Sequence, residues 1–279
     1  MQLWFTEEDD KTIRLGYRVE DVLYRERSEF QMVEVLDTSA YGKMLVIDGF
    51  VMTTEADEFV YHEMIAHVPL CLHKDPRQVL VIGGGDGGTI REVLRHDTVE
   101  RAVLCEIDEK VVEASRQFLP SIAGKLDDPR CEVRIGDGVA FIKEHTDAFD
   151  VIIIDSTDPI GPGEGLFSRE FYKSVANALK SDGLMVAQSE SPWYAPEILQ
   201  RIQRNIRGGF EHAAPYLGSV PTYPRGLWSW TLAANHPINP TAFDRRRLEA
   251  FADELKYLTP ELLPGAFALP PFVAKKFQV

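Results

Sequence analysis

The chain has 279 residues, of which 44% are hydrophobic and 27% charged, and its formal net charge is −14. This length and composition indicate a globular protein with one large domain and a smaller attachment. The charge argues against nucleic acid as a partner and suits a cationic ligand, although many enzymes are acidic for solubility alone. No segment approaches the ~20 apolar residues of a membrane-spanning helix.

The first 53 residues are predicted to form a small β domain. Alternating and β-branched apolar residues indicate strands over residues 12–20, 29–36 and 43–47, with turn residues between them. A helix is predicted over residues 55–67, ending near Pro69. The acidic start of the chain is unlike a signal or transit peptide. Together with three cysteines that lack metal-ligand spacing, it favours a cytoplasmic protein.

From residue 78 onward, short apolar strands alternate with amphipathic segments. The strands are predicted over residues 78–82, 101–105, 132–135, 151–154 and 184–187. Such alternation predicts a parallel sheet with helices on both faces. Residues 212–217 and 227–233 are predicted to form an antiparallel pair. The expected fold is α/β, with a doubly wound, Rossmann-like catalytic domain over residues 54–279 and the β domain over residues 1–53.

A glycine-rich loop follows the strand at residues 78–82. Gly83, Gly85 and Gly88 fit the GxGxxG pattern, in which glycines let a ligand approach the backbone closely. Dinucleotide enzymes and adenosylmethionine enzymes share this pattern. Asp86, in the middle of the loop, would repel a phosphate or a carboxylate, and so it favours a nucleoside whose tail carries an ammonium.

Acidic residues follow the next two strands. Glu106 is placed to accept both ribose hydroxyls of an adenosine, with a helix-capping role as the alternative, for which Asp108 is the better candidate. After the third strand, Asp137 could accept from the adenine amino group, beside Gly138. Acids at three successive strand ends therefore point to a bound adenosine.

Asp155 and Asp158 follow the buried strand at residues 151–154, at the edge where ligands of open α/β sheets bind. With Asp86 they are expected to converge on one crevice, where unpaired carboxylates raise one another's pKa unless a cation lies between them. A diamine, with amine pKa values of about 10, is a natural occupant. A helix cap is the alternative for either residue, and the glycine-rich residues 160–167 are predicted to form a mobile lid.

The combined motifs resemble the spermidine synthase (polyamine aminopropyltransferase) family over nearly the whole chain. They are GGGDGG with REV, then EID, GDG, DSTDPIGPGEGLF, AQSES and PTYPRG, with DGFVMTTEADEFVYHEMIAHVPL upstream and AFALPPFV near the end. The resemblance implies transfer of the aminopropyl group of decarboxylated S-adenosylmethionine to putrescine, which gives spermidine and methylthioadenosine. Decarboxylated S-adenosylmethionine would be a co-substrate, with no tightly bound cofactor and no metal. The resemblance of the β domain also implies a homodimer or homotetramer. The charge and the lack of a long apolar segment predict neither nucleic acid nor membrane as partner.

The resemblance also implies roles for residues by position. Gln31, Glu106 and Asp137 would hold the methylthioadenosine part, and Asp86 would bind the ammonium of the tail with His62 nearby. The full donor-binding set is Gln31, His62, Gly83, Gly85, Asp86, Glu106, Asp137 and Gly138.

For the acceptor, Asp155 would orient the attacking amine, helped by Tyr61 and Tyr223, while Asp158 and Gln188 would line the diamine channel. For Tyr61 and His62 the alternative is a simple core residue. Glu190 either adds a contact to the distal ammonium or faces solvent.

Other functions stay open at this point. A methyltransferase using intact adenosylmethionine and a non-catalytic polyamine-binding protein are both compatible with the fold, while Asp86 disfavours a nicotinamide dehydrogenase. Among acceptors, cadaverine, agmatine and spermidine are alternatives to putrescine.

Overall fold

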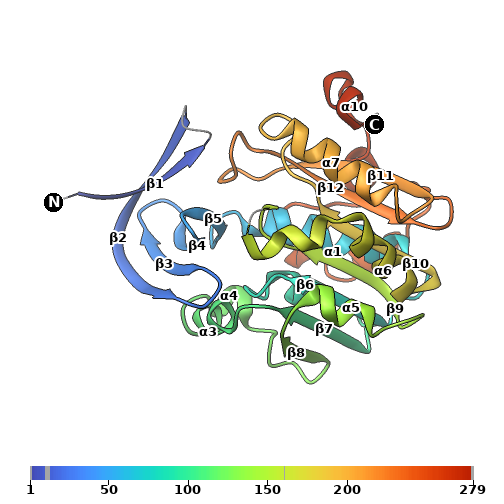
Figure 1. Cartoon of the computed structure of the whole chain (residues 1–279), viewed down its shortest axis with the longest axis horizontal. Helices are drawn as coiled ribbons and strands as arrows, with labels where there is room; N and C mark the ends of the chain where they lie inside the picture. Colours follow the sequence, from blue (N-terminus) through green and yellow to red (C-terminus); the bar gives the residue numbers. More distant parts are fainter. Residues whose placement is uncertain (1, 10–12, 160, 278–279) are drawn as a thin grey trace.

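Two β-sheets organise the protein, which we describe from a computed structural model covering residues 2–9, 13–159 and 161–277 (Figure 1). Thr12 and Ile160, which belong to the predicted first strand and lid, lie outside these residues. The chain completes a five-stranded sheet before it enters a seven-stranded one. No helix among the described residues is long and apolar enough to cross a membrane.

The first sheet is antiparallel and its strands pair in chain order. They are β1 (Leu3–Asp9), β2 (Ile13–Arg27), β3 (Met32–Thr38), β4 (Gly42–Ile47) and β5 (Phe50–Thr54). Asp48 and Gly49, both with positive φ, form the tight turn between β4 and β5. The sequence prediction missed β1 and β5 and ended β2 too early, because the second half of β2 is largely exposed and lacks apolar alternation.

The second sheet has the order β11-β12-β10-β9-β6-β7-β8. Its strands are β6 (Gln78–Gly83), β7 (Arg101–Glu106), β8 (Cys131–Ile135), β9 (Phe149–Asp155), β10 (Leu179–Gln188), β11 (His212–Ser219) and β12 (Leu227–Ala234). β6 to β10 are parallel, and β11 and β12 are antiparallel, which confirms the predicted arrangement. The strand order reverses between β6 and β9, where open α/β sheets bind ligands.

Helices cover both faces of this sheet. They are α1 (Glu58–Leu72), α2 (Gly88–Val93), α3 (Glu109–Phe118), α4 (Pro120–Ala123), α5 (Gly138–Lys143), α6 (Arg169–Ala178), α7 (Pro196–Ile206), α8 (Arg245–Glu249), α9 (Leu262–Gly265) and α10 (Pro271–Phe277). Short 3-10 helices lie at Gly161–Phe167 and Ala252–Glu254. Val79 and Val81 of β6 pack with α1 and α2, whereas Leu80 and Ile82 pack with α5, α6 and α7. This alternation explains the continuous apolar runs of the central strands.

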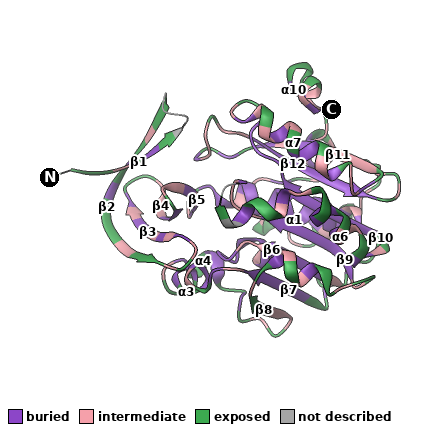
Figure 2. Ribbon diagram, viewed as in Figure 1, coloured by how far each residue is buried: buried purple, intermediate pink, exposed green. Residues whose placement is uncertain are grey.

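Helix α1 differs from its prediction at both ends. It begins at Glu58 and continues through Pro69 to Leu72. The helix is buried on nearly all sides (Figure 2), so packing outweighs the one backbone hydrogen bond that proline removes. The three cysteines are free thiols, with Cys71 and Cys105 buried and Cys131 half-buried.

The loop between β11 and β12 joins the two sheets. The Tyr17 hydroxyl donates to the Thr222 carbonyl at 3.0 Å, and the Tyr223 hydroxyl donates to the Met52 carbonyl at 2.8 Å. Asp57, just before α1, accepts from both the backbone N–H and the hydroxyl of Thr222. The N-terminal sheet therefore forms one side of the space above the carboxyl ends of β6, β7 and β9.

Candidate active site

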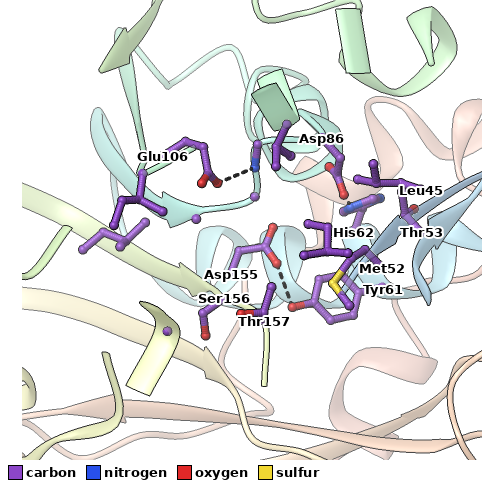
Figure 3. A pocket seen from close by; sticks show the side chains of 18 of the residues that line it. Leu45, Met52, Thr53, Tyr61, His62, Asp86, Glu106, Asp155, Ser156 and Thr157 are labelled. Carbon is purple, nitrogen blue, oxygen red and sulfur yellow. Dashed lines mark hydrogen bonds and ion pairs between the residues drawn. The ribbon is translucent and has the colours of Figure 1, made fainter. Parts of the chain in front are cut away.

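Two adjacent cavities lie at the carboxyl ends of the central strands. The first encloses about 1030 Å³, including its open mouth, and the second about 540 Å³. Both are lined by Met52, Tyr61, Ser156, Thr157 and Tyr223, so these residues form a common wall. In the first cavity Glu106 lies on one side and Asp86 with His62 on the other, and Asp155 lies between them (Figure 3).

Every residue predicted for the site lines one of these cavities. The first contains Gln31, Tyr61, His62, Gly83, Gly85, Asp86, Glu106, Asp137, Gly138, Asp155 and Tyr223. The second contains Tyr61, Asp158, Gln188 and Tyr223. The expectation that Asp86, Asp155 and Asp158 converge on one crevice is therefore wrong in part. Asp158 lies in the neighbouring cavity, because the chain leaves the sheet edge after Asp155.

The glycine loop is shaped by two carboxylates that pack against it. Gly84 has a φ of +69°, and a Cβ there would lie 2.5 Å from the Asp155 carboxylate. A Cβ on Gly85 would lie 2.9 Å from the Glu106 carboxylate. Glycine is therefore required here for the close approach of acidic side chains as well as for the turn. Gly163 and Leu166, in the predicted lid, also line the cavity.

Glu106 is held by backbone donors. Its Oε2 accepts from Gly85 N at 3.1 Å and its Oε1 from Asp108 N at 2.9 Å. Burial raises the pKa of this carboxyl to about 7, against the opposing effect of these N–H groups. Asp108 caps α3 by accepting from Lys110 N, as predicted, so the alternative capping role for Glu106 is not needed.

The other two residues predicted to contact the nucleoside differ in exposure. Asp137 is exposed and caps α5 through its Oδ1, which accepts from Val139 N at 2.8 Å. Asp137 therefore both lines the first cavity and caps helix α5. Gln31, between β2 and β3, is buried and lines the same cavity. The N-terminal sheet and the large sheet thus both contribute to the first cavity.

Asp86 faces a buried histidine. His62 Nε2 lies 3.4 Å from Asp86 Oδ1, and His62 Nδ1 lies 2.6 Å from Glu58 Oε2. Burial alone would lower the pKa of His62, but the two carboxylates outweigh it and raise this pKa to about 10. Burial opposes ionisation of Asp86 too, yet His62 and the Gly88 N–H hold its pKa below the usual value. His62 is therefore an imidazolium between two carboxylates.

Asp155 has hydroxyl partners. The Tyr61 hydroxyl donates to its Oδ1 at 2.8 Å, and the Thr89 hydroxyl donates to its Oδ2 at 2.6 Å. Burial, reinforced by the negative charge of Asp86, raises the pKa of Asp155. The tyrosine is buried, as the core interpretation expects, but its hydroxyl is directed at a cavity carboxylate.

Asp158, a half-buried residue of the second cavity, is paired with Glu190, a buried acid behind the cavity wall. Glu190 is only 1% exposed, which excludes the solvent-facing alternative, and its carboxyl is hydrogen-bonded to that of Asp158. Burial raises the pKa of both groups, and the charge of Asp158 raises that of Glu190 further. Two carboxyls can form this bond only when one carries a proton. Gln188 Oε1 accepts from Glu190 N at 3.0 Å, so it helps to position this residue.

Several residues at the site were not predicted from the sequence. Glu58, on α1, lines the first cavity and contacts His62, whereas Thr89, on α2, acts on the cavity through Asp155. Their signal was weak: Glu58 precedes His62 by one helical turn, and Thr89 starts the helix after the glycine loop. Asp57 and Thr222 are far apart in the chain, so no local pattern pairs them.

One possible metal cluster exists among the described residues, at the opposite edge of the sheet. His73, Asp150 and Asp182 offer ligand atoms within 4.8 Å of one another. Asp150 already accepts from the backbone of Arg77 and from Lys180, and His73 Nδ1 accepts from a backbone N–H. That last bond leaves the proton of a neutral His73 on Nε2, which disfavours a metal there.

Comparison with known proteins identifies related chains over the full length. The spermine/spermidine synthase domain matches residues 58–244, and the spermidine synthase tetramerisation domain matches residues 3–55. A polyamine aminopropyltransferase of Desulforudis audaxviator is 49% identical over 279 residues, covering 100% of both chains. One of Bacillus subtilis is 47% identical over 273 residues, or 98% of each chain.

Solved structures agree with these matches. A spermidine synthase in complex with the transition-state analogue AdoDATO superposes with a TM-score of 0.96 at 44% identity, covering 99% of this chain and 94% of that one. Spermidine synthase from Thermotoga maritima superposes with a TM-score of 0.94 at 43% identity, with the same coverage. These likenesses confirm the predicted fold class, a Rossmann-like sheet preceded by a small β domain.

Proposed function

The chain belongs to the spermine/spermidine synthase family and is a polyamine aminopropyltransferase, and on that premise we propose that it transfers the aminopropyl group of decarboxylated S-adenosylmethionine to putrescine, giving spermidine and methylthioadenosine. The observation that carries the proposal is the common wall of the two cavities. Tyr61 lines both cavities and donates to Asp155. A donor in the first cavity and an amine in the second would meet beside this carboxylate.

The first cavity is assigned to the donor. Gln31, Glu106 and Asp137 would hold the nucleoside, with Gly83, Gly85 and Gly138 allowing it to approach the backbone. The support is that the Glu106 carboxylate and the glycine loop lie side by side. Asp86 would bind the ammonium of the aminopropyl tail, and His62 would act through Asp86, because its two ring nitrogens already contact carboxylates.

The second cavity is assigned to the acceptor. Asp158 would bind the distal ammonium and Gln188 would help to shape the channel, while Tyr61 and Tyr223 would flank the attacking amine. The support is the raised pKa that burial imposes on Asp158, since an ammonium beside it would restore its ionised form. Putrescine is the proposed acceptor, because its two amines match one reacting end and one anchored end.

The reaction is a direct displacement. The amine nitrogen forms a bond to the aminopropyl carbon, the carbon–sulfur bond breaks, and its electron pair converts the sulfonium to a neutral thioether. The attacking amine must lose a proton. An Asp with an ordinary pKa of ~4 lies about six units below an amine of ~10, which corresponds to about 8 kcal/mol. The raised pKa of Asp155 narrows this difference, so Asp155 orients the amine and assists its deprotonation.

Oligomerisation and location form part of the same proposal. We assign residues 1–53 to a domain that pairs subunits and residues 54–279 to the catalytic domain, with a homodimer or homotetramer as the result. The support is the tetramerisation-domain match and the exposed apolar side chains of Leu3, Trp4 and Val22 on the first sheet. The free cysteines support a reducing compartment, the cytoplasm.

The test supplies the purified protein with either decarboxylated or intact S-adenosylmethionine and a panel of putrescine, cadaverine, agmatine and spermidine. Products are identified by mass spectrometry and initial rates are compared. Spermidine and methylthioadenosine in equal amounts, with putrescine as the fastest acceptor, are expected. Methylated amine without spermidine would instead establish the competing methyltransferase activity.

A further inference from the structure

Behind Asp86 lies a row of buried charged side chains. His62 is 2% exposed and Glu58 6%, and their side chains are 2.6 Å apart. On its other side, Glu58 Oε2 lies 2.7 Å from Arg91 Nη2. Asp86, His62, Glu58 and Arg91 thus alternate in charge from the cavity wall into the packing between α1 and α2. None of the roles proposed above uses Glu58 or Arg91.

The contacts to Asp86 distinguish its two oxygens. Gly88 N donates to Oδ1 at 2.7 Å, and His62 Nε2 lies 3.4 Å from the same atom. Because both protein contacts engage Oδ1, Oδ2 is the oxygen left for a ligand. The His62 ring packs so closely beneath the loop that a Cβ on Gly88 would collide with it. The glycine loop and His62 therefore hold the Asp86 carboxylate in one orientation.

His62 can hold the Asp86 carboxylate in this orientation only while both of its ring nitrogens carry a proton. Nδ1 donates to Glu58, and Nε2 faces Asp86 Oδ1 at 3.4 Å, a contact that is favourable only when Nε2 also carries a proton, so the ring must be protonated. Burial disfavours this form, and Glu58 and Asp86 restore it. The other charges near His62 are Asp155, at the end of β9, and Arg91, on α2 behind Glu58. Without Glu58, the nearest remaining charge on that side would be the Arg91 cation, which disfavours the imidazolium.

We propose that Glu58 is a positioning residue for the aminopropyl donor: it holds His62 as the cation paired with Asp86 Oδ1, so that Asp86 Oδ2 is presented to the ammonium of the donor's tail. The inference rests on the proposed function, in which Asp86 binds that ammonium. Although Glu58 lines the first cavity, its Oε2 is already engaged by His62 and Arg91, so its assigned part is to position His62. Its effect should be confined to ligands that carry the tail, because Glu106, Gln31 and Asp137 are not connected to this row of charges.

The test compares two ligands of the first cavity in Glu58→Gln. Decarboxylated S-adenosylmethionine carries the ammonium tail and methylthioadenosine lacks it. The KM for the donor should rise about tenfold, as expected for a weakened hydrogen bond to a charged group. The Kd for methylthioadenosine, from calorimetry, should stay within about twofold. The kcat should change less than the KM, because Asp155 keeps both of its hydroxyl partners.

The pH profile supplies a readout that a merely structural role would not move. His62 has a pKa of about 10, so the wild-type protein retains the imidazolium up to that pH. Loss of Glu58 lowers this pKa, so kcat/KM for the donor should decline at a lower pH in Glu58→Gln than in wild type. His62→Gln provides an amide N–H that does not titrate. In the His62→Gln background, the pH profile should therefore be the same with and without Glu58→Gln.

Glu63→Gln is the matched control. Glu63 is a buried acid of the same helix, and its carboxylate accepts from the backbone N–H groups of Lys256, Tyr257 and Leu258 rather than from the site. This variant should lose stability without changing the ratio of donor to methylthioadenosine affinity. If Glu58→Gln does not fold, His62→Ala removes the donor to Asp86 while leaving the Glu58–Arg91 pair, and it should raise the donor KM similarly.

Three results would overturn the inference: an unchanged donor KM in the folded variants, an equal loss of affinity for both ligands, or the same discrimination in Glu63→Gln. A failure of the proposed function would look different. The wild-type protein would then form no spermidine from decarboxylated S-adenosylmethionine, before any variant is compared.

Discussion

The buried acids at the two ends of the site are balanced in different ways. Glu58 and Asp86 are paired with the cations Arg91 and His62, which outweigh burial and lower the pKa of both carboxyls. Among the residues that the structure describes, the side chains that donate to Asp155 are both hydroxyls. We call the first pair the compensated acids, and Asp155, Asp158 and Glu190 the uncompensated acids, whose pKa values burial raises.

This difference indicates where an external cation is needed. At the compensated acids the protein supplies its own positive charge, and a ligand's ammonium meets a carboxylate that is already ionised and oriented. At the uncompensated acids, burial without a cation is unfavourable, and a bound ammonium relieves it. A diamine bound in the second cavity, as proposed, would therefore supply the positive charge that the described residues do not place beside these acids.

The largest expected effect is at Asp155. Asp155→Asn keeps the shape of the side chain but removes its charge and its ability to accept a proton. The kcat should fall about 10³-fold, within the range for a positioned acid–base group. The Kd for methylthioadenosine should stay within about twofold, because the contacts proposed for the nucleoside are elsewhere. A loss of methylthioadenosine affinity comparable to the loss of kcat would show that Asp155 binds the nucleoside and would contradict its role toward the amine.

Asp158 tests the acceptor end alone. Asp158→Asn should raise the KM for putrescine about 10- to 100-fold, the cost of losing a hydrogen bond between charged groups. A monoamine such as butylamine has no distal ammonium, so its KM should change much less. Equal effects on the two amines, measured by initial rates, would show that Asp158 does not anchor the distal end.

Glu106 lies in the first cavity, like the compensated acids, but burial raises its pKa to about 7, as it raises the pKa of the uncompensated acids. Below that pH it becomes protonated and loses acceptor capacity for ribose hydroxyls. The affinity for methylthioadenosine should therefore fall as the pH is lowered from 8.5 to 5.5, by about tenfold if one hydrogen bond to the charged form is lost. Glu106→Gln should bind weakly at every pH. A flat wild-type profile in calorimetry would contradict this role.

Glu190 gives the smallest effect. Its pKa is raised well above the usual value by burial and by Asp158, so the pair gains charge only as the pH rises. The KM for putrescine should therefore decrease by a few-fold as the pH rises through this transition. Glu190→Gln mimics the protonated form permanently and should flatten that dependence. Persistence of the wild-type slope would assign the titration to another group.

The sequence predicted the site's composition more accurately than its geometry. Gly83, Asp86, Glu106 and Asp155 could be placed together because strands that alternate with helices bring their carboxyl ends to one edge of a parallel sheet. The missed strands β1 and β5 show the limit of such patterns: short, partly exposed strands carry little apolar alternation.

Order along the chain, turn chemistry and apolar periodicity are local properties, so the sequence by itself determined the sheet, the glycine loop and the acids at the strand ends. Only the tertiary structure decided how those acids are divided between two cavities and which of them face a cation. Glu58 becomes relevant through His62, one helical turn away, and Glu190 through Asp158, which is far from it in the chain. These relations depend on side-chain directions and on burial, because the ionisation of an acid is set by its surroundings in space.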